Sequence, residues 1–211
     1  VARTLASVDG STGKSSTNFT SLDDGSSISY DDLLDYDGHI NVHLSSDDLT
    51  IVAQGDIGGN ELTGTTKTYT LDEADVSGIS GTAEFAERAN GTALLTVTLE
   101  GTDAGDVHPS HIHVNDVATG GESIVDLTDV DGDTGIAKTH ISEFNDGNPL
   151  TYDDILTLDA HINVHLSGNQ METYIAEGNI GSNEEQIDAP NTLYYNCSIH
   201  SVMNGTITIT D

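Results

Sequence analysis

The chain has few of the residues that define several common classes of protein. It contains one cysteine, three prolines and no tryptophan in 211 residues, and five lysines and arginines against 36 aspartates and glutamates. A single cysteine excludes an internal disulfide. No apolar run reaches the roughly 18 residues of a membrane-spanning helix, so membrane insertion is not expected. The net charge of −31 argues against nucleic acid and anionic lipid as partners, because both carry charge of the same sign.

The excess of acidic residues is typical of a protein exposed to a saline or calcium-rich exterior, and we predict an extracellular or cell-surface location. No charged-then-apolar leader follows Val1, which favours a mature product from which a signal has been removed. Four Asn-x-Ser/Thr sequons are candidate glycosylation sites, at Asn18, Asn90, Asn196 and Asn204.

An internal repeat organises the chain, because residues 5–61 return as residues 127–184. YDDLLDYDGHINVHL becomes YDDILTLDAHINVHL, and AQGDIGGNE becomes AEGNIGSNE. The offset is 122 positions up to His43 and His165 and then 123, so we expect a bulge or a longer turn near residues 171–173. The phase predicts an incomplete module at 1–65, a complete module at 66–188 and the start of a further repeat at 189–211.

Alternation of apolar and polar residues with a period of two dominates the chain and predicts strands separated by Gly, Asp, Asn and Ser turns. Only 30–34 and 152–156 suggest a helical turn, with Ser29 and Thr151 as N-caps. Many short strands predict an all-β fold, an antiparallel Greek-key β-sandwich or flattened barrel of superoxide-dismutase-like or Ig-like type. The predicted strands are 81–87, 93–101, 110–116, 122–128, 160–167, 172–178 and 205–211.

The alternation in HINVHL and SHIHV places histidines on one face of each strand. His161, Asn163 and His165 share a face opposite Ile162 and Val164. In the same way, the two histidines of SHIHV, His111 and His113, lie on one face of their strand. The apolar faces form the core, so we expect the histidines to point outward and to converge if the two strands are neighbours. Such a group suits a metal site, or it lines a polar surface without a metal.

HPSHIHVN together with the two INVHL segments resembles the CHRD domain, a secreted β-sandwich module related in pattern to copper–zinc superoxide dismutase. In that enzyme family, an H-x-H strand and a later V-H-x-x-x-D-D-L strand supply copper ligands. The matching positions are His111, His113 and His165, and the first copy repeats the second motif with His43 and 47–49. The resemblance covers about 75–185 as a full module and 5–61 as a second half.

This chain departs from the dismutase pattern. Only His140 lies between the two motifs where that family clusters its zinc ligands, and neither arginine, Arg3 or Arg88, lies in a late loop. A protein of charge −31 also repels superoxide. We therefore do not expect an enzyme.

Two further motifs suggest metals. Cys197, His200 and Met203 form C-x-x-H-x-x-M, which resembles the copper loop of cupredoxins, with His161 or His165 as the upstream histidine. The alternative is a chance triplet in a terminal strand. The aspartates of DVDGDTG resemble the opening of a calcium loop, and the alternative is an Asp-Gly turn without a metal. Copper and calcium are therefore the candidate ions. These calcium candidates are Asp129, Asp131 and Asp133.

The phase of the repeat suggests self-association. An incomplete module leaves sheet edges unpaired, and the alternating segment 205–211 has the form of a donor strand. Our first hypothesis is a structural subunit of an extracellular fibre, assembled head-to-tail by strand addition, with metal at surface histidines. The second is an extracellular copper protein for storage or electron transfer. Ragged ends of a fragment would explain the same phase without assembly.

Overall fold

The structure is a computed structural model that describes residues 3–184, 192–196 and 204–208. Nearly all of its regular structure is β, with two short helices. In chain order the elements are α1 (Tyr30–Leu34), β1 (Asp37–His43), β2 (Ile51–Gly58), β3 (Leu62–Glu73), β4 (Ser80–Arg88), β5 (Ala93–Glu100), β6 (Val107–His108), β7 (Ser110–Val114), β8 (Ser123–Asp126), β9 (Val130–Asp131), β10 (Ile136–Ile141), α2 (Tyr152–Ile155), β11 (Asp159–Ser167), β12 (Gln170–Gly181), β13 (Thr192–Asn196) and β14 (Asn204–Thr208).

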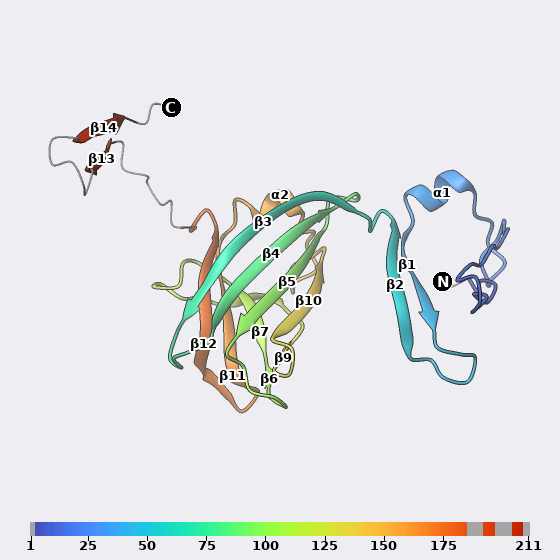
Figure 1. Cartoon of the computed structure of the whole chain (residues 1–211), viewed down its shortest axis with the longest axis horizontal. Helices are drawn as coiled ribbons and strands as arrows, with labels where there is room; N and C mark the ends of the chain where they lie inside the picture. Colours follow the sequence, from blue (N-terminus) through green and yellow to red (C-terminus); the bar gives the residue numbers. More distant parts are fainter. Residues whose placement is uncertain (1–2, 185–191, 197–203, 209–211) are drawn as a thin grey trace.

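Ten of the strands form one antiparallel sheet in the order β6-β9-β10-β5-β4-β3-β12-β11-β7-β8. The sheet curls into a half-barrel, so that β3, β4, β5 and β10 form one layer and β12, β11 and β7 lie behind it (Figure 1). The predicted all-β sandwich is therefore confirmed.

The connections between the layers are of the Greek-key kind. The chain leaves β5, forms β6 to β9 away from it, and returns as β10, which pairs with β5. Only Pro109 separates β6 from β7, although these strands stand near opposite ends of the sheet order. A hydrogen bond from the His165 amide to the Pro109 carbonyl, 2.8 Å long, ties this bend to β11.

Strand alternation builds the core as the sequence predicts. On β5, the side chains of Ala93, Leu95, Val97 and Leu99 are buried, and the intervening residues are more exposed. The opposite layer contributes apolar residues from β7, β11 and β12, namely Ile112, Ile162, Val164, Ile175 and Ile180. The apolar face of HINVHL is thus the core face.

Both helical turns are confirmed, and both are capped alike. Ser29 and Asp32 form a capping box at the start of α1, and Thr151 and Asp154 form another at the start of α2. The two copies differ at the connection that follows. A loop of residues 44–50 joins β1 to β2, whereas β11 and β12 continue to a Ser167–Gln170 pair and a tight turn, near the expected insertion.

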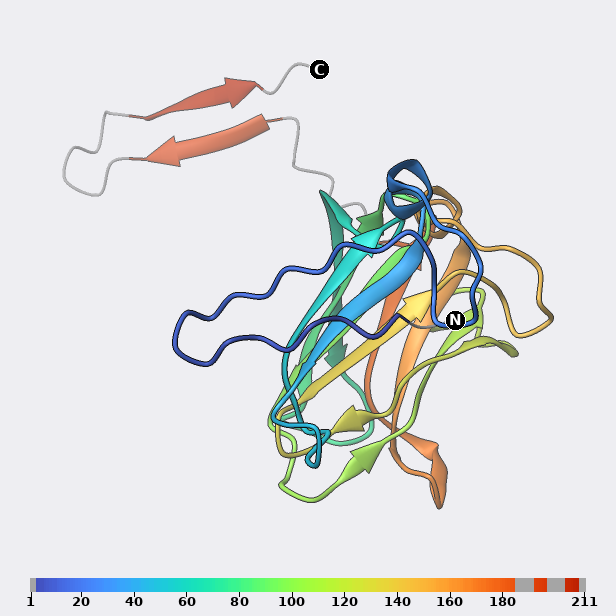
Figure 2. The same cartoon turned by 90° about the vertical axis from the view of Figure 1, so that its right-hand side faces the viewer.

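The first copy forms a separate two-stranded sheet, β1-β2, which lies beside the half-barrel (Figures 1 and 2). Arg88 at the end of β4 connects the two parts. Its guanidinium lies 2.9 Å from the Asp56 carboxylate on β2 and also donates to the Asn60 carbonyl. β13 and β14 pair with each other. No helix in the described ranges is both long and apolar enough to cross a membrane.

Candidate metal centre

The strand that carries SHIHV and the strand that carries HINVHL are neighbours. β7 and β11 pair antiparallel, with His113 opposite His161 and His111 opposite Asn163. In an antiparallel pair, directly opposite residues point to the same face of the sheet. The histidines of both strands therefore meet on the face that turns away from the apolar core, as the alternation predicts.

The expectation that these histidines are displayed on the outer surface is wrong. His161 and His165 are only 2% and 3% exposed, and His111 and His113 are half-buried. Residues 115–122 run beside this face and hydrogen-bond to it: the carbonyls of Asn115 and Gly121 lie within 3.0 Å of the Nδ1 atoms of His161 and His113. Contacts with this loop, and at His165 with Tyr174 and the Met171 carbonyl, thus bury a face that the period-two pattern predicts to be open.

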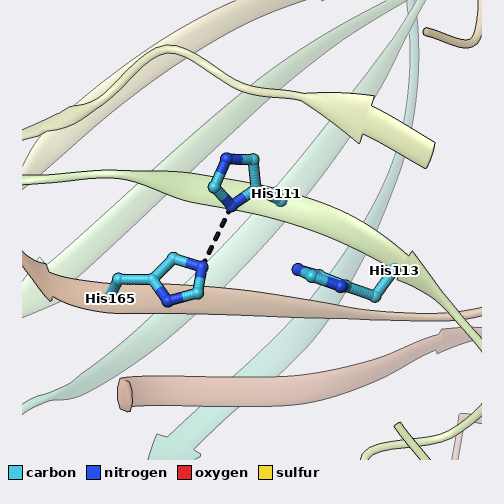
Figure 3. Close-up of side chains that lie close together, drawn as sticks. All are labelled: His111, His113 and His165. Carbon is cyan, nitrogen blue, oxygen red and sulfur yellow. Dashed lines mark hydrogen bonds between the residues drawn. The ribbon is translucent and has the colours of Figure 1, made fainter. Parts of the chain in front are cut away.

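Three of the imidazoles form a compact group (Figure 3). One ring nitrogen from each of His111, His113 and His165 lies within 4.8 Å of the others. The closest pair is Nδ1 of His111 and Nε2 of His165, 3.0 Å apart. A tetrahedral ion with metal–nitrogen bonds of about 2.0–2.1 Å holds its ligand atoms roughly 3.3–3.4 Å apart. Small movements of the rings would therefore bring all three nitrogens into contact with one ion.

Backbone carbonyls orient two of these rings. Nδ1 of His165 lies 2.6 Å from the Met171 carbonyl, and Nδ1 of His113 lies 3.0 Å from the Gly121 carbonyl. A carbonyl only accepts, so each Nδ1 carries the proton and each Nε2 presents its lone pair to the centre. Nε2 of His113 is buried without a hydrogen-bond partner. A metal ligand held by a second-sphere carbonyl has this arrangement.

Burial also favours the neutral imidazoles that metal binding requires. The pKa of His111, of His113 and of His165 is lowered from 6.5, and the largest cause in each case is desolvation. The neighbouring histidines lower each pKa further, while Asp126 and Asp129 oppose the shift at His111. Since neutral histidine is the ligand form, these shifts favour metal binding at neutral pH.

This shift predicts how stability depends on pH. A histidine whose pKa is lower in the folded chain than in the unfolded chain contributes stability at pH values above the unfolded pKa. This contribution is lost as the pH falls from the unfolded pKa toward the folded pKa. The metal-free protein should therefore lose stability between pH 7 and pH 5. Denaturant midpoints at the two pH values measure the effect, and a H111Q/H113Q/H165Q variant should show a smaller difference. Equal midpoints for the unmodified chain at both pH values would contradict the assignment.

His161 and His140 lie outside the group of three. His161, a candidate ligand from the sequence, stacks on His113 with ring centroids 5.4 Å apart and contacts the Asn115 carbonyl. His140 lies on β10, where burial and the positive charge of Arg88 lower its pKa. The structure thus gives His161 a packing role beside the centre.

Asn163 is a residue of this face to which the sequence analysis gave no role. It is buried opposite His111, and its Oδ1 has no hydrogen-bond partner. The signal was its place between His161 and His165 in the alternating strand. A buried amide oxygen without a partner is available to a water molecule on a bound ion.

The three aspartates of the calcium motif do not come together as a group of side-chain ligands. The only group of three or more potential ligands in the described part of the chain is the histidine group. The Asp131 carboxylate instead accepts hydrogen bonds from the amides of Asp133 and Thr134, and Asp133 accepts from Gly105. These hydrogen bonds are those of the Asp-Gly turn that the sequence also allows. A calcium ion at Asp129, Asp131 and Asp133 stays a prediction.

The first copy forms the same hydrogen-bonded turn. Asp9 accepts from the amides of Ser11 and Thr12 in the same turn, although two of the three acids are missing there. The hydroxyl and amides of Ser11, together with Thr12, lower the pKa of Asp9 to about 2. Capping of the turn alone accounts for the conserved geometry of the two copies.

Two sets of candidate residues are described only in part or not at all. Cys197, His200 and Met203 lie outside the described residues, so the cupredoxin-like loop stays a prediction. Of the sequons, Asn18 and Asn90 are exposed, and the backbones of Asn196 and Asn204 lie in β13 and β14. Their glycosylation also stays a prediction.

The first copy reproduces one strand of the centre without the other. Nδ1 of His43 lies 2.7 Å from the Leu49 carbonyl, just as His165 contacts Met171, 122 positions later. No strand pairs with β1 except β2 among the described residues, and His43 is exposed. The centre therefore needs β7 as well as the repeated motif.

No protein-family model and no curated protein sequence matches the chain. The resemblance to the CHRD domain stays a prediction that rests on the motifs in the sequence.

Proposed function

We propose that the protein is an extracellular metal-binding β-sandwich module that holds one copper or zinc ion at His111, His113 and His165. The observation that carries this proposal is the convergence of three imidazole nitrogens within 4.8 Å on two paired strands. Neutral imidazole suits both ions, and copper(II) binds such nitrogen sites most tightly among the common divalent metals.

The surroundings of the three histidines favour a cation. Asp126 and Asp129 act electrostatically on His111, and Glu172 acts on His165. Three protein ligands leave a fourth position for water or another small ligand. The centre therefore resembles open sites rather than closed structural sites with four protein ligands.

We assign this centre a binding role rather than a catalytic one. A chain of net charge −31 repels an anionic substrate such as superoxide. The guanidinium groups of Arg3 and Arg88 form ion pairs with Asp23 and Asp56. Neither arginine acts on the three histidines as a steering charge.

Element analysis of the protein as isolated, followed by equilibrium dialysis against copper and against zinc, tests the proposal. We expect one ion per chain at saturation, released by acid. Less than a tenth of an ion per chain after dialysis against both metals would refute it.

A second candidate function is that of a structural subunit of an extracellular fibre. The observation that favours it is the separate sheet β1-β2. Among the described residues, β2 pairs only with β1, and large apolar side chains of this part of the chain are exposed. An open strand edge in water is a site for pairing with another chain.

A further inference from the structure

The hairpin β1–β2 has the local structure of β11–β12. In the first copy, the Asn60 side chain donates to the Asp37 carboxylate at 2.7 Å. In the second, Asn183 donates to Asp159 at the same distance. The pairing of β1 with β2 also repeats the pairing of β11 with β12, including a register shift at the histidine of each first strand. The two hairpins therefore present equivalent faces and equivalent edges.

The two hairpins differ in what covers them. Tyr30 is 74% exposed, whereas its counterpart Tyr152 is 3% exposed, and Ile40 is 39% exposed against 0% for Ile162. The same sequence pattern that fills the core in the second copy thus faces water in the first. Other large apolar residues exposed on this part of the chain are Leu34, Leu44, Leu49, Ile51 and Val52. So many exposed large apolar side chains on one part of the chain indicate an interaction surface.

The edge of β2 is open where the edge of β12 is paired. In the half-barrel, β3 pairs with β12, and Asp72 lies opposite Glu177. The counterpart of Glu177, 123 positions earlier, is Gln54, which is exposed on β2. Among the described residues, β2 pairs with β1 alone. The missing neighbour is therefore a strand equivalent to β3.

The C-terminal hairpin repeats the pairing of β3 with β4. Thr70 pairs with Thr82, and 124 positions later Tyr194 pairs with Thr206. The two strands have the same antiparallel register in both hairpins. β13–β14 is thus a second copy of the element that covers β12.

We propose that β13–β14 of one chain adds to the open edge of β2 in a second copy of the protein. The hairpin takes the place that β3–β4 has beside β12. If the pairing of Asp72 with Glu177 is repeated there, Asn196 lies opposite Gln54. This inference rests on the second candidate function and names its two surfaces. Donor and acceptor are different surfaces of the chain, so the contact repeats head to tail and does not close by itself.

The hairpin of a second copy is a better candidate for the edge of β2 than the hairpin of the same chain. β13–β14 and β1–β2 lie on opposite sides of the half-barrel (Figure 1). Each copy carries a net charge of −31, so like charges oppose the encounter. Assembly should therefore increase with ionic strength, because salt screens the repulsion between exposed charges.

Directed disulfide trapping tests the proposal on the full chain. In a C197S background, Q54C combined with N196C should give a ladder of covalent oligomers under oxidised glutathione at 1 M NaCl. Mixing a Q54C chain with an N196C chain of different tag length should give the mixed dimer. The matched control combines Q54C with T206C, since Thr206 lies on the strand of the donor hairpin that does not meet β2. It should cross-link at least tenfold less.

Any other result of the cross-linking overturns the proposal. A covalent monomer with an internal disulfide would mean that the hairpin closes on its own chain. Equal cross-linking of the T206C control would mean non-specific collision, and no cross-linking would mean that the edge does not accept this hairpin. Metal content is read on the same samples. One ion per chain with no ladder would refute the assembly alone, whereas a ladder without metal would refute the centre alone.

Discussion

Replacing His165 with alanine is expected to abolish tight metal binding. Removal of an outer-sphere partner typically weakens a metal site 10- to 100-fold, so loss of one of three direct ligands should cost more than about 100-fold in affinity. His165 presents Nε2 to the centre 3.0 Å from His111, and its Nδ1 is fixed by the Met171 carbonyl. Competition titration of zinc with a chromophoric chelator measures the loss.

The repeat supplies a matched control for this experiment. His43 occupies the same position of the same motif and makes the same contact, to the Leu49 carbonyl, but it has no strand equivalent to β7 beside it. H43A should therefore bind zinc as tightly as the unmodified chain. Equal losses in H43A and H165A, or no loss in either, would contradict the assigned site.

The second large effect concerns stability, and it is also expected in only one copy. Replacing Ile162 with alanine should lower the free energy of unfolding by about 2–5 kcal/mol, because the side chain is fully buried in the core between the layers. I40A, the same change in the first copy, should cost less than about 1 kcal/mol, since Ile40 is 39% exposed. Urea unfolding of both variants measures the difference.

This comparison requires dilute protein at low salt, where the proposed assembly is absent. A loss of more than 2 kcal/mol in I40A under these conditions would mean that the first copy is covered within its own chain. A loss below 1 kcal/mol in I162A would mean that the core does not include this strand.

The class of fold and the strands of the complete module follow from the sequence because each strand has one buried face. Alternation in 93–101 and 160–167 predicts β5 and β11 closely. Alternation gives no strand order, however, and the shortest strands, β6 and β9, have two residues each. Their pairing depends on the bend at Pro109 and on contacts between distant residues, which no local pattern contains.

The three histidines were predictable as a group, but their burial was not. The faces of SHIHV and HINVHL follow from the period of two, and the convergence followed once the strands were assumed to be neighbours. The burial depends on contacts with other segments, such as the hydrogen bond between His113 and the Gly121 carbonyl, and the alternation of the strands does not predict these contacts. In the calcium motif, the sequence does not show that the Asp131 carboxylate accepts hydrogen bonds from the amides of its own turn.

X-ray absorption at the zinc edge of the zinc-loaded chain shows which side chains hold the ion. The histidine centre predicts a first shell of nitrogen and oxygen at about 2.0–2.1 Å, with outer-shell scattering from three imidazole rings and no sulfur. It also predicts that this imidazole signal is lost in H165A and kept in C197S. A sulfur shell at about 2.3 Å that disappears in C197S would place the metal at Cys197 and contradict the histidine centre.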